Sequence, residues 1–146
     1  MNRHGRINVL ALGVIVGLVL LSALFLLSRD GIAQVSARFM NALAQGNTEQ
    51  LAQLTYLGDR KPDEIKAKWE FTVNQASKYY RFKWKIVSVS ETGPDMGAAR
   101  LQLIRNSDSL SSYEENFSLP LVRVDGNWKV DVANISRDMY PSLPRY

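Results

Sequence analysis

The chain contains a run of 21 residues without a charged side chain, from Ile7 to Leu27. A helix of this length would extend about 31 Å, enough to cross the hydrocarbon core of a bilayer. A cleavable signal peptide has a shorter apolar region that ends in small residues, whereas this run ends in Phe25-Leu26-Leu27. The run therefore predicts a retained transmembrane helix over residues 7–28, which would hold the chain in a lipid bilayer.

Charged residues on either side of the span set its predicted orientation. Arg3 and Arg6 precede it in an arm of residues 1–6, and Arg29 behind it is followed directly by Asp30. The positive-inside rule places such an arm in the cytoplasm. We therefore expect a single-pass protein of the cytoplasmic (inner) membrane, with the C-terminal domain periplasmic or extracellular.

Gly13 and Gly17 lie about one helical turn apart within the span. Two glycines at this spacing allow a second helix backbone to approach closely, which is typical of packing faces in membranes. Glycine is also common in membrane helices, so the spacing arises by chance as well. Both interpretations, a transmembrane packing face and a chance spacing, stay open.

Two residue types limit the chemistry of the exterior part. The sequence has no cysteine, and its only histidine is His4, before the span. The exterior part therefore has no disulfide, no zinc-thiolate or iron–sulfur site and no Ser-His-Asp triad. We expect no catalytic residue, no metal and no cofactor, and a protein that is not an enzyme. An exported domain without cysteine also favours a bacterial envelope.

The net charge of the exterior part is small. Two of the 18 Lys and Arg residues precede the span, which leaves 16 against 14 Asp and Glu. A nucleic-acid-binding domain usually carries a strong basic excess. We therefore expect no nucleic-acid partner.

The spacing of apolar residues changes along the exterior part. It predicts a helix over residues 32–45 that ends at Gly46, a short helix capped by Asn47, and a third helix from Pro62. Alternation then predicts four antiparallel strands, near residues 82–87, 99–103, 117–121 and 128–132, with a hairpin turn at Asp125-Gly126-Asn127.

This order predicts one α+β domain over residues 29–134, with about three helices packed on a curved four-stranded antiparallel sheet. Residues 135–146 contain Pro141 and Pro144. Since proline interrupts helices and strands, we expect these residues to form an extended or partly ordered C-terminal tail.

Two stretches resemble the cystatin-like, nuclear transport factor 2-like superfamily: VSARFMNALAQGN at residues 35–47 and LVRVDGNWKVD at residues 121–131. The resemblance covers roughly residues 32–133 and implies a cystatin-like roll. It leaves the function open, because the superfamily includes isomerases, dehydratases, transport factors and assembly proteins. Assembly components of type IV secretion machines and accessory proteins of mycobacterial lipid importers share the layout of one span and one exterior domain.

Enzymes of this superfamily place Asp, Tyr and often His in the cone between the sheet and the helices. The resemblance makes Tyr56, Tyr79 and Tyr80 the candidates for the cone, although each can equally be a packing residue with a hydrated hydroxyl. Asp131 lies in the last strand, where alternation with Trp128 and Val130 places it outside the core.

Four cations alternate with aromatic residues around the start of the first strand: Lys78, Arg81, Lys83 and Lys85. The simplest interpretation is a helix end followed by a strand with its lysines in water. Contact with an acidic partner or an anionic membrane surface is a further interpretation.

The leading hypothesis is a non-enzymatic accessory or assembly subunit of a bacterial envelope membrane complex. It would bind partners through the transmembrane helix and the curved sheet, because only residues 29–31 separate the span from the domain. The alternative is a membrane-tethered binder of small apolar ligands, or an isomerase-like or dehydratase-like enzyme, that uses the cone. A homodimer through the sheet is a third arrangement that the resemblance implies.

Overall fold

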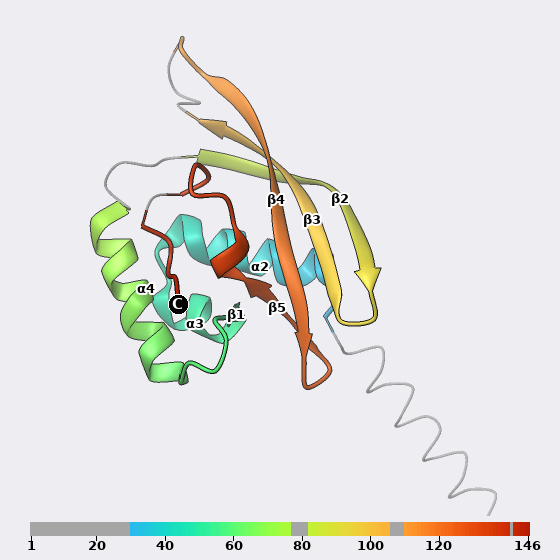
Figure 1. The fold of residues 1–146 in the computed structure, drawn as a ribbon. Helices are drawn as coiled ribbons and strands as arrows, with labels where there is room; N and C mark the ends of the chain where they lie inside the picture. Colours follow the sequence, from blue (N-terminus) through green and yellow to red (C-terminus); the bar gives the residue numbers. More distant parts are fainter. Residues whose placement is uncertain (1–29, 77–81, 106–109, 141) are drawn as a thin grey trace, which may run out of the picture.

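The structure, a computed structural model, describes residues 30–76, 82–105, 110–140 and 142–146. Helices pack against one face of a curved sheet (Figure 1). In chain order the elements are α2 (Ile32–Gln45), α3 (Thr48–Leu54), β1 (Thr55–Tyr56), α4 (Pro62–Ala76), β2 (Phe82–Gly93), β3 (Met96–Arg105), β4 (Tyr113–Val124), β5 (Asn127–Asp131) and the 3-10 helix η1 (Val132–Asn134). The predicted α+β class is confirmed.

The predicted transmembrane helix, residues 7–28, lies outside the described residues, together with Gly13 and Gly17. In the part of the chain that the structure describes, no helix is both long enough and apolar enough to cross a bilayer. The span and its packing face therefore stay predictions from the sequence.

Local chemistry explains where the helices begin and end. Helix α2 ends at Gln45 and is capped by Gly46, which has a φ of 66°, a conformation that glycine adopts without strain. The side-chain oxygen of Asn47 accepts the backbone N–H of Gln50 at 3.1 Å and caps α3. Pro62 is the first residue of α4. A backbone N–H at this position would have no acceptor within the helix, so its absence in proline costs no hydrogen bond. The predicted start or end at each of these positions is confirmed.

The sheet has five strands in the order β1-β5-β4-β3-β2. The prediction of four strands was wrong because β1 has only two residues, too few to show alternation, and pairs parallel with β5. The other pairs of neighbouring strands are antiparallel.

Between β4 and β5, Asp125 and Gly126 have φ values of 51° and 78°, as a two-residue type I′ hairpin requires. The predicted hairpin turn is confirmed.

Burial alternates along β3, so that its residues from Gly97 to Arg105 at every second position face the helices. On the helix side, the rings of Phe39 and Trp69 meet edge to face, with centroids 5.8 Å apart. We call the opposite side of β2, β3 and β4 the outer face. One face of these strands therefore belongs to the core and the other to the surface.

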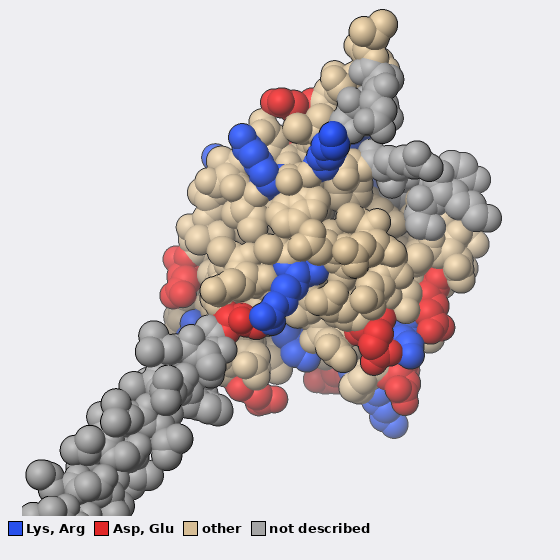
Figure 2. All heavy atoms as spheres, turned by 180° about the vertical axis from the view of Figure 1, so that it is seen from behind, with Lys and Arg blue, Asp and Glu red and all other residues tan. Residues whose placement is uncertain are grey.

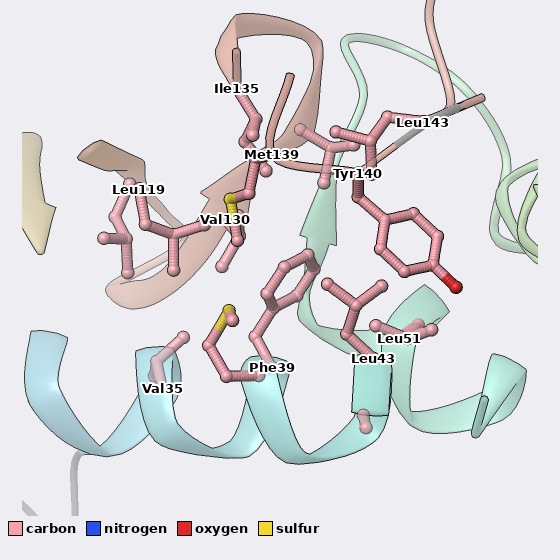
Figure 3. Packing of buried hydrophobic residues seen from close by; sticks show 14 of the residues in the cluster. Val35, Phe39, Leu43, Leu51, Leu119, Val130, Ile135, Met139, Tyr140 and Leu143 are labelled. Carbon is pink, nitrogen blue, oxygen red and sulfur yellow. The ribbon is translucent and has the colours of Figure 1, made fainter. Parts of the chain in front are cut away.

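The residues predicted as a C-terminal tail contribute to this core. In Figure 3, Ile135, Met139, Tyr140 and Leu143 lie across from Phe39 of α2. Met139 and Tyr140 are only 1% and 2% exposed. Burying a large apolar side chain stabilises a fold by about 2 kcal/mol, so these residues help to hold the domain together.

Candidate functional site

The cone between the sheet and the helices is filled by side chains of the chain itself. Tyr140 packs edge to face on Phe82 of β2, with ring centroids 6.2 Å apart, and both Met139 and Leu143 are buried beside it (Figure 3). The C-terminal residues thus form part of the core between the sheet and the helices.

Arg105, at the end of β3, fastens these residues to the sheet. It is 5% exposed, and its Nη2 donates to the carbonyl oxygens of Asp138 and Met139 at 2.8 and 2.7 Å. Its Nε donates to the carboxylate of Glu115 at 2.5 Å. Arg105 is not among the residues predicted from the sequence, although the alternation that points Leu101 and Leu103 inward also points residue 105 inward.

A second set of hydrogen bonds joins residues 142–145 to α4 and to Ile135, the residue after η1. The hydroxyl of Thr72 donates to the carbonyl oxygen of Ser142, and Lys68 Nζ donates to that of Arg145 at 2.9 Å. Arg145 Nη2 in turn donates to the carbonyl oxygen of Ile135 at 2.9 Å. The C-terminal segment is therefore held at both ends.

The prediction that Asp131 lies outside the core was wrong, because this residue is only 8% exposed. Strand β1 lies beside it, with Tyr56 as its parallel partner, and Asn134 Nδ2 donates to its Oδ2 at 2.7 Å. Burial raises the pKa of the Tyr146 hydroxyl, and the nearby Asp131 and Tyr56 raise it further.

Within the described residues, no three His, Cys, Asp or Glu side chains gather closely enough to hold a metal ion.

Of the three predicted tyrosines, the structure describes only Tyr56, which is half-buried in β1. Tyr79 and Tyr80 lie outside the described residues, so the convergence of the three in the cone stays a prediction. Tyr56 lines a half-open pocket of about 470 Å³ between α3, β1 and α4, together with Ile65 and Lys66. Lys66 pairs with Glu49 at 2.8 Å, and this hydrogen-bonded ion pair raises the lysine pKa.

Of the four predicted cationic contacts, Lys78 and Arg81 lie outside the described residues. Lys83 and Lys85 are exposed on the outer face of β2, where they alternate with half-buried residues of the inner face. The side of the molecule seen in Figure 2 carries scattered Lys and Arg side chains but no continuous basic stripe among the described residues. That side therefore lacks the pattern typical of nucleic-acid binding.

No model of a protein family matches the chain, and no curated protein matches it either. Solved structures do match. A domain with a cystatin-like fold from Nostoc punctiforme is 12% identical, with a TM-score of 0.51 over 68% of this chain and 70% of the other. A Thiobacillus denitrificans protein named after the association domain of calcium/calmodulin-dependent protein kinase type II is 10% identical, with a TM-score of 0.51 over 70% and 90%.

An NTF-2-like protein from Shewanella oneidensis is also similar, with 14% identity and a TM-score of 0.46 over 68% of this chain and 90% of the other. At such low identities a structural likeness concerns the fold alone. The likeness to the Nostoc punctiforme domain supports the cystatin-like fold that the two sequence stretches predicted, and the function has to be argued from the surface of the chain itself.

Proposed function

We propose that this protein is a non-enzymatic, single-pass accessory or assembly subunit of a bacterial envelope membrane complex. Its N-terminal span would pack against partner helices, and its exterior domain would bind a further partner through the outer face of the sheet. The observation that carries the proposal is that the chain fills its own cone while it leaves the outer face exposed.

The filled cone favours binding over catalysis. A substrate in the cone would have to displace Met139 and Tyr140, and each large side chain exposed to water would cost about 2 kcal/mol. The two hydrogen bonds from Arg105 to main-chain carbonyls would break as well. A partner on the outer face has none of these costs.

The short connection to the predicted span also supports a docked subunit. Helix α2 begins at Ile32, so only three residues, 29–31, separate it from the predicted span of residues 7–28. Asp30 forms an ion pair with Arg38 of α2, and the side-chain oxygen of Gln34 accepts the N–H of Gly31 at 2.5 Å. These contacts restrict the conformations of the short connection, so the domain would stay close to the bilayer.

The first test is to isolate the full-length chain from its own membranes in a mild detergent and to identify by mass spectrometry what accompanies it. A stoichiometric set of membrane proteins is the expected result. A lone monomer would contradict the proposal, and a lone homodimer, detected by light scattering, would replace it with self-association through the sheet.

The role of the span is tested by Gly13→Leu with Gly17→Leu. Leucine side chains would block close approach of a partner helix, so we expect the complex to lose this subunit while the exterior domain stays folded. Ala11→Leu with Ala23→Leu, elsewhere in the span, is the matched control. Unchanged association of the glycine variant would contradict the packing face.

The pocket between α3, β1 and α4 favours a second candidate function, the binding of a small apolar ligand. Ala52, Leu57 and Ile65 line it, and Tyr56 offers a hydroxyl. A ligand of the folded state raises the melting temperature by mass action. A thermal-shift screen of the full-length chain with steroids, lipids and polyketide-like compounds should then find a ligand that Ala52→Phe, which fills the pocket, no longer binds.

A further inference from the structure

The outer face contains a hollow of about 490 Å³ whose lining is Val87, Arg100, Asn116, Phe117 and Ser118. In the register of the sheet, Arg100 of β3 lies between Ser88 of β2 and Ser118 of β4. A guanidinium, an amide and hydroxyl groups all donate hydrogen bonds. The hollow therefore surrounds one cation with further hydrogen-bond donors.

The cations of this face have no acidic partner in the described part of the chain. The described ion pairs involve other cations, namely Arg38, Arg60, Lys66, Arg105 and Arg123. Among the described residues, the one acid at the outward positions of β2, β3 and β4 is Glu114, which accepts a hydrogen bond from Gln102 Nε2 at 2.9 Å. The positive charge of Lys83, Lys85 and Arg100 is thus left for an external group.

These charges are close enough to act together. Lys85 pairs with Gln102, and Arg100 occupies the next outward position of β3. Diagonal neighbours of this kind lie about 7–8 Å apart, which is no longer than the Debye length of about 8 Å at physiological ionic strength. An anion in the hollow would therefore be attracted by both side chains.

We propose that the outer face binds an acidic, extended segment of a protein partner, with one of its carboxylates in the hollow against Arg100. This inference rests on the proposed function and names the chemistry of the partner. A guanidinium can bind a carboxylate through two parallel hydrogen bonds, and Asn116 and Ser118 add donors around it.

Two features favour a protein segment over lipid headgroups. Val87, which is 50% exposed at the hollow, offers an apolar contact to a side chain. Strand β2 is the last strand of the sheet order, so its outer edge has no strand partner among the described residues. An extended segment can pair with the backbone of such an edge, whereas a lipid headgroup cannot.

The test uses the full-length chain in a non-ionic detergent, with a hexaglutamate peptide as the probe. We expect amide NMR shifts centred on Ser88, Arg100 and Ser118, and binding at least tenfold weaker for Lys85→Gln with Arg100→Gln. The matched control removes two exposed cations elsewhere, Lys61→Gln with Arg137→Gln, and should bind as the parent does.

Shifts that centre elsewhere, an absent response, or equal weakening in the control would overturn the acidic-segment inference. A co-purifying partner held equally well by parent and outer-face variant would overturn it too, while leaving the proposed function intact. The chain is also mixed with phosphatidylglycerol vesicles. Vesicle binding that depends on Lys85 and Arg100, without a response to hexaglutamate, would assign the face to lipid and overturn the inference.

Discussion

The guanidinium of Arg105 donates a hydrogen bond of 2.7 Å to the carbonyl oxygen of Met139, and so joins the end of β3 to a segment that lies 34 residues later. Both residues are buried. Because arginine carries five N–H donors in a planar fork, this side chain can reach two main-chain carbonyls and the carboxylate of Glu115 at once. The pair thus keeps the C-terminal residues in the cone.

We expect Arg105→Met to lower the free energy of unfolding by about 2–4 kcal/mol. The variant keeps an apolar stem but loses three hydrogen bonds from a charged group, each of which is worth about 1.5–3 kcal/mol. Part of this loss is offset because the variant no longer buries a charge, which is costly. Urea unfolding of the full-length chain in a mild detergent, followed by tryptophan fluorescence, measures the loss.

The control for this variant is Arg100→Met, which removes an arginine from the outer face of the same strand. Exposed substitutions usually change stability by no more than about 0.5 kcal/mol. If both methionine variants were equally stable, the role of Arg105 in holding the C-terminal segment would be wrong.

The features that the sequence predicted correctly depend on neighbouring residues. A helical period and a left-handed stop at Gly46 define α2 within 15 residues, and Asp125-Gly126 carries the hairpin conformation in two. The superfamily likeness of residues 35–47 and 121–131 rests on these same local features. Fold class and helix ends could therefore be predicted from sequence alone.

The features that the sequence did not predict depend on partners far along the chain. Strand β1 exists because Tyr56 meets Asp131, 75 residues later, and this pairing also buries the aspartate that alternation placed outside. The C-terminal residues are held in place by hydrogen bonds with Arg105 and with α4. From the sequence, Pro141 and Pro144 had instead predicted an extended or partly ordered tail. For the site, Tyr56 was singled out for the cone but lines the pocket beside α3 and α4.

Gly97 should not tolerate a side chain. A Cβ there would lie 2.5 Å from Cδ1 of Ile32 and 3.0 Å from the carbonyl oxygen of Ser90. We expect Gly97→Ala to destabilise the fold by about 1–3 kcal/mol through overpacking, with partial recovery on adding Ile32→Val, which removes the Cδ1 atom. In the same unfolding assay, Gly93→Ala is the control, since nothing lies within 4 Å of its Cβ. Equal stability of the two alanine variants would contradict this view of the contact.

Thr55 joins β1 to two helices through its hydroxyl. Its Oγ1 donates to the carbonyl oxygen of Leu51 at 2.7 Å and accepts the indole N–H of Trp69 at 2.8 Å, and both bonds are buried. Thr55→Val leaves that N–H without its acceptor, so we expect a loss of about 1–3 kcal/mol. Thr55→Ser keeps the hydroxyl and should lose less. Thermal unfolding monitored by near-ultraviolet circular dichroism compares the two, and a serine variant as unstable as the valine variant would argue against the hydrogen bonds.

Burial raises the pKa of the Tyr140 hydroxyl above its usual value of about 10. Above that pH the unfolded chain releases the phenolic proton while the folded chain retains it. The contribution of Tyr140 to stability is therefore complete below about pH 10 and is lost as the pH rises through the raised pKa.

The Tyr140→Phe variant has no phenolic proton to release at position 140. Its free energy of unfolding should therefore fall less than that of the parent between about pH 9 and about pH 11. Urea unfolding of the full-length chain at several pH values across this window tests the difference. Tyr113→Phe, which removes the hydroxyl of a tyrosine that is 48% exposed on β4, is the matched control. Parallel curves for parent and Tyr140→Phe would mean that this hydroxyl meets water, and that the C-terminal residues do not stay in the cone in solution.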